Sequence, residues 1–377
     1  MKNPLIMTPG PTSIHEEVRK ALSQEITNPD LDKRFYEFYK NTCNKLQKVM
    51  NTTNEVLVLS GEGILGLEAA CASLIEKGDR VLCIDNGIFG KGFGDFAKMY
   101  GAEVVYFKAD YRRGIDVNQL EELLRKDNNF KFATLVHCET PSGITNLVDK
   151  ICPLLNKYRI ISVVDAVSAI GGEVLKVDDW QMDIVLGGSQ KCLSAPPGLT
   201  FLSISEKAWN KILHRKSPIA GFYANLANWK TWYEDKWFPY TQPISDIYGL
   251  SVAVDRWLAE SNSIQRHQTI AEAVRLTFKK AGLELYPLDS YSNTVTTINL
   301  PEDVSFKDIY QSMLNDYNIM IAGAFGFLKD KVIRIGHMGE NCYEEKVYIT
   351  LKALDGVLRK LDVQLLVELH KCFVDNL

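Results

Sequence analysis

Short apolar runs alternate with amphipathic stretches along the first two hundred residues of the chain. The runs rich in β-branched residues predict strands at Val56–Leu59, Arg80–Ile84, Glu103–Phe107, Phe132–Val136, Ile160–Val164, Ile184–Leu186 and Thr200–Ile204. The stretches before and between them predict helices at Ile14–Ser23, Leu31–Met50, Leu65–Ile75, Phe93–Tyr100, Val117–Arg125 and Leu147–Lys157. Because apolar strands separated by amphipathic helices are typical of a sheet covered on both faces, the pattern predicts an α/β fold with a mainly parallel sheet.

The pattern changes in the second half of the chain. Residues 209–246 are dense in aromatic side chains, which we interpret as an interface with a second subunit. One long amphipathic stretch follows from Ile244 to Ala281. The remainder, Leu283–Leu377, mixes strand and helix patterns and predicts a smaller α+β domain.

Composition excludes several classes of protein. Of the 377 residues, 46% are hydrophobic and 24% are charged, which is ordinary for a globular chain with room for two domains. The net charge of -4 and the lack of a basic cluster argue against a nucleic-acid partner. No apolar run is long enough to span a membrane or to form a signal peptide, so we expect a cytoplasmic protein. The 8 cysteines form no C-x-x-C pair, so we expect reduced core residues and no metal site.

Lys191 occupies the most distinctive position in the sequence. The apolar run Ile184–Leu186 and two glycines precede it, and Pro196-Pro197-Gly198 follows it, so the lysine lies on a tight turn at the end of a strand. Sheets of this kind bind ligands at that edge. A lysine that loses its proton there can attack a carbonyl group. The alternative is an ordinary solvated loop lysine.

A glycine-rich segment, Gly61-Glu62-Gly63-Ile64-Leu65-Gly66, follows the first predicted strand and opens a helix. It matches G-x-G-x-x-G, and Asp85 lies where the ribose-binding acid of a dinucleotide site would be, so a nicotinamide-dependent oxidoreductase is a competing hypothesis. In either case the backbone N–H groups at the helix N-terminus suit a phosphate. The remaining alternative is that the glycines only allow close helix–strand packing.

Three more candidates follow other strands. Asp165 ends a hydrophobic strand, where its carboxylate needs a cationic partner or caps the next helix. Thr140 offers a hydroxyl, and Phe89 either stacks on a flat ring or belongs to the core. His137 and Glu139, beside Thr140, are interpreted as structural hydrogen-bonding residues.

These candidates share the carboxyl edge of the predicted sheet. A phosphate cradle, an acid, an aromatic ring, a hydroxyl and a lysine are the set that pyridoxal phosphate needs. The lysine holds the aldehyde as a Schiff base, and the acid keeps the pyridine nitrogen protonated. The sequence therefore predicts pyridoxal phosphate as cofactor.

The segment Gly188-Ser189-Gln190-Lys191-Cys192-Leu193-Ser194-Ala195-Pro196-Pro197-Gly198 resembles the Schiff-base motif of class V aminotransferases of fold type I. Within them the chain is most similar to the alanine–glyoxylate and serine–pyruvate aminotransferases, over nearly its whole length. The resemblance implies a seven-stranded, mainly parallel sheet sandwiched by helices. It also implies a large domain over 15–262, a small domain over 263–377, and a segment 1–14 near the active site.

The resemblance also assigns roles to residues. Lys191 would bind the cofactor and carry the proton in a ping-pong transfer from alanine or serine to glyoxylate or pyruvate. The other implied cofactor contacts are Gly63, Ile64, Phe89, Thr140, Asp165 and Gln190, together with Thr241 from the second subunit of a homodimer. Arg334, in Val332-Ile333-Arg334-Ile335-Gly336, would bind the substrate carboxylate, for which a bidentate guanidinium is suited. Gly10 would lend it a backbone N–H, whereas the alternative for Arg334 is a surface ion pair.

The chain departs from the family pattern at several positions. Glu62, Gly63 and Ile64 replace the usual Ser-Gly-His/Thr of the phosphate loop, Phe238 replaces the neighbouring subunit's tyrosine, and Phe89 replaces the ring-stacking tryptophan. His137-Cys138-Glu139-Thr140 is similar to 2-aminoethylphosphonate–pyruvate transaminases, so a phosphonate substrate is the alternative. A non-catalytic protein of the same fold is a further alternative. A cysteine desulfurase would depend on Cys342, whose surroundings do not resemble a sulfur-acceptor loop.

Overall fold

The structure is a computed structural model that describes residues 3–377. Its centre is a seven-stranded sheet in the order β2-β10-β9-β8-β5-β3-β4. The strands are β2 (Glu55–Ser60), β3 (Arg80–Asp85), β4 (Glu103–Lys108), β5 (Phe132–Val136), β8 (Ile161–Asp165), β9 (Ile184–Gly188) and β10 (Leu199–Ile204). β10 runs antiparallel to both of its neighbours, and the remaining pairs are parallel. The predicted α/β fold and mainly parallel sheet are confirmed.

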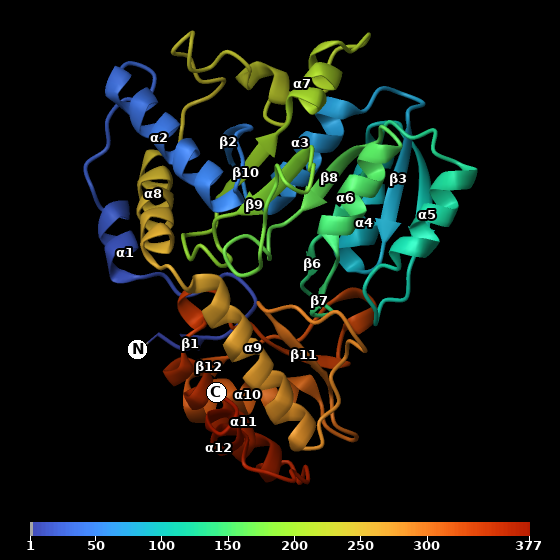
Figure 1. The fold of residues 1–377 in the computed structure, drawn as a ribbon. Coiled ribbons are helices and arrows are strands. Elements are labelled where there is room, and N and C mark those ends of the chain that lie inside the picture. The colour runs from blue at the N-terminus through green and yellow to red at the C-terminus, as the bar shows by residue number, and fades with distance from the viewer. Residues whose placement is uncertain (1–2) are drawn as a thin grey trace.

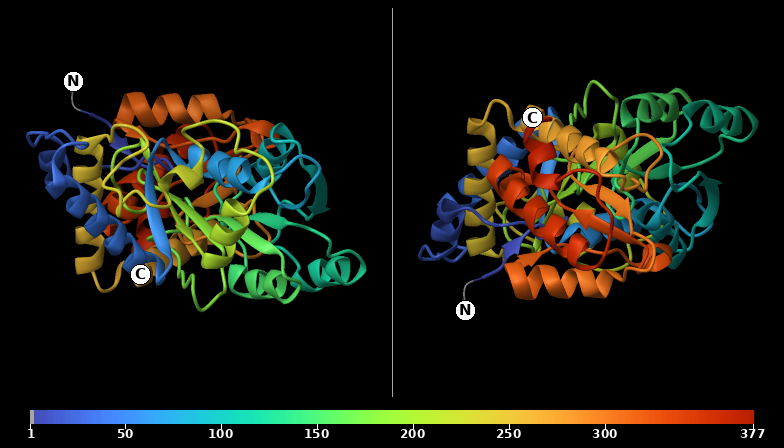
Figure 2. Two further views of the ribbon diagram at one scale, coloured as in Figure 1. Left: turned by 90° about the horizontal axis from the view of Figure 1, so that it is seen from above. Right: turned by 90° about the horizontal axis from the view of Figure 1, so that it is seen from below.

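Helices cover both faces of this sheet (Figures 1 and 2). The connecting helices are α3 (Gly63–Leu74), α4 (Ile88–Met99), α5 (Val117–Lys126), α6 (Val148–Lys157) and α7 (Glu206–Leu213). α3 packs on β9 and β10, whereas α4 packs on β3 and β5. α1 (Glu16–Leu22) and α2 (Lys33–Met50) pack on α8 (Ile244–Ala259) beside the sheet. The carboxyl ends of the parallel strands therefore all lie at one edge of the sheet.

A smaller group of elements, which includes the C-terminal end of the chain, lies beyond that edge (Figure 1). Its helices are α9 (Ser263–Lys280), α10 (Phe306–Tyr317), α11 (Glu344–Lys360) and α12 (Leu369–Val374). Its strand pairs are β11 (Thr296–Asn299) with β13 (Val332–Ile335), and β1 (Leu5–Ile6) with β12 (Ile319–Met320). The N-terminal segment is thus joined to the C-terminal part through the β1–β12 pair.

Two clusters of buried apolar side chains hold these parts together. The larger surrounds the seven-stranded sheet, and the smaller joins Met7 to α9, α10, α11 and α12.

The exact division between domains at residues 262 and 263 stays a prediction. Within residues 3–377, no helix is both long and apolar enough to span a membrane.

The structure divides the long amphipathic stretch and lengthens one predicted helix. The stretch Ile244–Ala281 forms two helices, α8 and α9, which are separated at Glu260-Ser261-Asn262. Ser and Asn favour caps and turns over helix interiors, since their side chains compete for backbone hydrogen bonds. α4 starts at Ile88 rather than Phe93, directly after Gly87. Phe89 therefore lies in its first turn.

Part of the aromatic segment 209–246 belongs to the core of its own chain, and the interface with a second subunit stays a prediction for the rings that remain exposed. Trp229, Trp232 and Phe238 are at most 3% exposed. Phe238 stacks on Tyr36 of α2 at 4.5 Å between ring centroids. The rings that remain about half exposed are those of Phe222, Tyr223 and Trp237.

Candidate active site

A cavity at the carboxyl ends of the strands brings together most of the predicted site residues. Those lining it are Gly63, Ile64, Phe89, Thr140, Asp165, Gln190 and Lys191, with Glu62 and Ser168 beside them. They come from the segments that follow β2, β3, β5, β8 and β9. The sheet therefore assembles residues that are more than a hundred positions apart in the sequence.

Lys191 is largely buried, so its interpretation as a solvated loop lysine is wrong. Its Nζ donates a hydrogen bond to the Pro9 carbonyl oxygen at 2.8 Å. Gly10 closes over the side chain so tightly that a Cβ there would lie 2.5 Å from Lys191 Cδ. Burial lowers the pKa of Lys191, as does the nearby positive charge of Arg334, while Asp165 opposes both effects. A lowered pKa gives the amine a larger fraction in its proton-accepting form.

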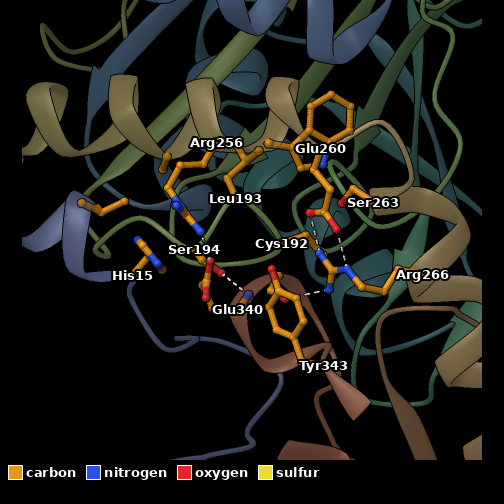
Figure 3. Close-up of a pocket in the computed structure, with 14 residues that line it drawn as sticks. His15, Cys192, Leu193, Ser194, Arg256, Glu260, Ser263, Arg266, Glu340 and Tyr343 are labelled. Atoms are coloured by element: carbon orange, nitrogen blue, oxygen red, sulfur yellow. Dashed lines mark hydrogen bonds and ion pairs between the residues drawn. The ribbon is translucent and has the colours of Figure 1, made fainter. Parts of the chain in front are cut away.

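A network of hydroxyl groups fixes the far side of the Lys191 turn. Thr12 Oγ1 donates to the Lys191 carbonyl oxygen at 3.0 Å and bonds Ser194 Oγ at 3.0 Å. Ser194 Oγ in turn accepts the Glu340 N–H at 2.8 Å. Figure 3 shows Ser194 and Glu340 lying together, with Arg256 within ion-pair distance of Glu340. The lysine turn is therefore tied to the N-terminal segment and to the smaller group of elements.

Asp165 ends β8 with its side chain only 6% exposed. Its Oδ1 accepts the Val167 N–H at 2.9 Å, and it forms no ion pair with any described residue. Burial raises the pKa of Asp165 to about 6, while the Val167 N–H and the Lys191 charge act in the opposite direction. A buried carboxyl of this kind is suited to a cationic partner such as a protonated pyridine nitrogen.

Other buried polar groups around the cavity suit a ring with polar substituents. Thr140 Oγ1 and Ser168 Oγ form a hydrogen bond of 2.5 Å. Gln190 Oε1 is buried and has no hydrogen-bond partner among the described residues. Such orphaned groups are costly unless a ligand satisfies them. The ring end of the cavity therefore fits pyridoxal phosphate.

At the opposite end, the backbone N–H groups of Gly63 and Ile64 lie in the first turn of α3, where a helix provides no acceptor for them. They suit a phosphate. Close packing also explains these glycines, since a Cβ on Gly63 would lie 2.7 Å from Val167 Cγ2. The Glu62 side chain caps no N–H group of α3 and lines the same cavity. A carboxylate therefore lies beside the N–H groups of Gly63 and Ile64 that are expected to bind the phosphate.

Glu139 is a structural hydrogen-bonding residue, as predicted. Its carboxylate accepts the N–H groups of Phe89 and Gly90, each at 2.9 Å, at the start of α4. Burial raises its pKa to about 7. The His137 side chain does not hydrogen-bond as expected, because its Nδ1 has no partner among the described residues. The hydrogen bonds of His137 come from its backbone, whose N–H donates to the Asp165 carbonyl oxygen and whose carbonyl oxygen accepts the Asn146 N–H, each at 2.7 Å.

Arg334 is 8% exposed, so its interpretation as a surface ion pair is wrong. Its Nε donates to the Gly323 carbonyl oxygen at 2.6 Å, and its Nη1 to the Thr140 carbonyl oxygen at 3.4 Å. Within residues 3–377 it has no carboxylate partner. Burial lowers its pKa to about 10, which leaves the guanidinium charged at neutral pH. A buried guanidinium without a counter-ion can bind a carboxylate ligand.

Thr241 does not line the cavity of its own chain. It is exposed, in a surface groove beside Thr27 and Pro29. Ser168 and Ser194 were not among the predicted site residues. Ser168 follows Asp165 by three residues in the same turn, which was a usable signal, whereas nothing in the sequence indicated that Ser194 meets Glu340.

The aminotransferase class-V family model matches residues 7–326. This chain belongs to the class V aminotransferases. It is therefore a pyridoxal-phosphate-dependent transaminase of fold type I, acting on an amino donor and a keto acid. The competing oxidoreductase and non-catalytic hypotheses are wrong.

Named relatives of this aminotransferase align with nearly all of it. The pyridoxamine–pyruvate transaminase of Mesorhizobium japonicum is 34% identical, over 94% of this chain and 91% of the relative. The alanine–glyoxylate aminotransferase of Callithrix jacchus is 31% identical, over 94% of this chain and 87% of the relative. The crystal structure of ureidoglycine–glyoxylate aminotransferase from Bacillus subtilis superposes with a TM-score of 0.96 at 28% identity, covering 100% of this chain and 98% of the other.

Proposed function

We propose that this aminotransferase moves the amino group of a small amino acid, alanine or serine, to glyoxylate or pyruvate. The observation that carries the proposal is the meeting of Lys191, Asp165 and an unpaired Arg334 around one edge of the sheet. The names of the relatives supply glyoxylate and pyruvate as acceptors. Each substrate in turn would use the same cavity, which is the basis of a ping-pong cycle.

Different residues of the chain would bind the cofactor, transfer the proton and orient the substrate. When bound, pyridoxal phosphate supplies a ring that accepts electrons and carries the amino group between the two substrates. Asp165 would hold the ring nitrogen, and Lys191 Nζ would anchor the cofactor and then take and return the α-proton. Thr140 and Gln190 would hold the polar ring substituents, and Phe89 would lie against the ring face. Arg334 would orient the carboxylate of the substrate. The Gly10 N–H would assist only after leaving the Thr8 carbonyl oxygen, to which it donates at 2.8 Å.

We infer a cytoplasmic homodimer with shared active sites. The exposed position of Thr241 supports this inference, because a phosphate contact from Thr241 requires a second copy of the chain. Phe222, Tyr223 and Trp237, each about half exposed, are candidates for the contact between copies. The proposed large domain at 15–262 and small domain at 263–377 would enclose each cavity between them.

An activity screen of amino donors against keto acids tests the proposed substrates. We expect turnover of alanine or serine with glyoxylate or pyruvate, and none with 2-aminoethylphosphonate. Turnover of the phosphonate alone would show that the substrate class is wrong while leaving the reaction type intact.

A second candidate function is transfer from pyridoxamine, whose own ring would then occupy the place of the pyridoxal phosphate that the family binds, and Glu62 is the observation that favours it. A carboxylate at the phosphate end of the cavity repels a phosphate dianion, but it can accept a hydrogen bond from the alcohol that pyridoxamine carries in its place. The 34% identical relative named as a pyridoxamine–pyruvate transaminase supports the same candidate.

Binding to the ligand-free protein separates the two donors. If pyridoxamine is the donor, the absorbance titration should show tighter binding of pyridoxal than of pyridoxal phosphate, and Glu62→Ser should reverse that order by about tenfold or more. Glu62→Gln keeps the shape and removes the charge, so it should act in the same direction. Tighter binding of pyridoxal phosphate to the wild type, unchanged in both variants, would exclude this candidate.

A further inference from the structure

The segment that follows β12 brings an exposed aromatic ring close to the candidate carboxylate site. The main chain of Ala322 pairs with that of Arg334, whose N–H donates to the Ala322 carbonyl oxygen at 2.6 Å. The Arg334 Nε bond to the Gly323 carbonyl oxygen fixes the next residue as well. Phe325 therefore lies only two residues beyond the carbonyl that holds the guanidinium.

Phe325 also contacts a residue that lines the cofactor cavity. Its ring packs edge-on against Phe89, which lines that cavity, with 5.8 Å between centroids and 77° between planes. Gly326 lies beside Ile88 at the start of α4, so the segment is held against the large sheet. Even so, the Phe325 side chain stays 47% exposed. A half-exposed ring that packs on Phe89, in the segment that also holds the Arg334 guanidinium, offers apolar surface to a ligand.

The charges around the cavity limit what such a ligand can carry. Among the described residues that line the cavity, Lys191 is the cation, and Arg334 bonds the carbonyl oxygen of Thr140, which also lines it. The proposed function already assigns these two cations to the amine and the α-carboxylate. Glu62 and Asp165 line the same cavity, and Glu139 accepts the N–H group of Phe89 beside it. A second anionic group on the substrate would find no further cation among the residues of this chain that line the cavity, and the carboxylates there would repel it.

We propose that Phe325 determines side-chain specificity, by forming with Phe89 an apolar wall that favours amino donors with uncharged side chains over aspartate or phosphonates. This inference rests on the proposed function and names its substrate class more closely. Phe325 acts by contact with the substrate side chain and takes no part in proton transfer.

The test measures kcat/KM for alanine, 2-aminobutyrate, norvaline and aspartate with one keto acid. In the wild type, kcat/KM should rise by up to about threefold for each added methylene, as expected for a partly buried apolar group, and aspartate should be the poorest donor. Phe325→Ala should abolish that rise, mainly through KM, and Phe325→Leu should restore part of it. Phe325→Arg should improve aspartate at least tenfold relative to 2-aminobutyrate.

Phe327→Ala is the matched control, because Phe327 is similarly exposed at 38% but packs on Tyr111 with 4.9 Å between ring centroids. It should keep the wild-type order of donors. An unchanged order in all Phe325 variants, or an equal loss for all four donors, would overturn the inference. Absence of transamination by the wild type with every donor would instead contradict the proposed function.

Discussion

The largely buried Lys191 and the buried Asp165 are groups of opposite charge whose pKa values both shift towards neutrality. Burial lowers the pKa of the lysine and raises that of the carboxyl, because each loses the hydration of its charged form. In the ligand-free protein neither shift is offset by an ion pair. A cofactor that meets both groups would relieve two desolvation costs at once.

Asp165→Asn should therefore stabilise the ligand-free protein and weaken its binding of the cofactor. The folded-state pKa of about 6 lies above the ordinary value of 3.8. The protonated carboxyl thus stabilises the fold below pH 3.8, and this contribution is lost as the pH rises through about 6. At pH 8 the buried carboxylate costs about 3 kcal/mol, which the neutral amide avoids.

Urea unfolding of the ligand-free proteins measures this difference. Asp165→Asn should be more stable than the wild type at pH 8, and the gain should disappear near pH 4. The same variant should bind pyridoxal phosphate more weakly and lose about 100-fold or more in kcat. If Asp165→Asn and the wild type had the same free energy of unfolding at pH 8 as well as at pH 4, the Asp165 carboxyl would be hydrated rather than buried.

At the scale of elements, α3 depends on glycines for its close approach to the sheet. A Cβ on Gly66 would lie 2.6 Å from Thr200 Oγ1, and that hydroxyl is fixed by its hydrogen bond to the Gly187 carbonyl oxygen at 2.8 Å. The resemblance of Gly61–Gly66 to a dinucleotide fingerprint thus has a packing cause at Gly66. Only the N-terminal part of the segment borders the cavity.

Gly66→Ala should lower the free energy of unfolding by about 1–3 kcal/mol, because the added methyl group overpacks the contact between α3 and β10. Gly92→Ala in α4 is the control, since a Cβ there would have no neighbour within 4 Å. It should leave stability unchanged or raise it by up to about 1 kcal/mol. Equal destabilisation by both substitutions, measured by urea unfolding, would contradict the packing account.

The sequence was sufficient to predict elements that local residue patterns specify. It was not sufficient where contacts between distant segments determine burial or hydrogen bonding. The β-branched runs predicted all the strands of the large sheet, and their ends located Asp165, Thr140 and Lys191 on one edge. The burial of Trp229 and Trp232 was not predictable, because it depends on packing against α2. The same holds for Ser194, whose partners Thr12 and Glu340 are far away in the sequence.

At the scale of the whole molecule, the position of Thr241 outside its own cavity leads to a test of the proposed dimer. Lys191→Ala and Thr241→Ala chains, mixed under conditions that exchange subunits, should regain activity at limiting cofactor. In the mixed dimer, one site receives Lys191 from one chain and Thr241 from the other, and is fully wild type. Mixtures that are no more active than the separate variants would show that Thr241 does not serve the other subunit.

The covalent attachment of the cofactor to Lys191 tests the central claim most directly. The protein loaded with pyridoxal phosphate should lose its yellow colour on reduction with borohydride, and peptide mass spectrometry should then find the reduced cofactor on Lys191. Lys191→Ala should show no such label and no transamination. An unmodified Lys191 in the reduced wild type, or full activity in the Lys191→Ala variant, would contradict the account.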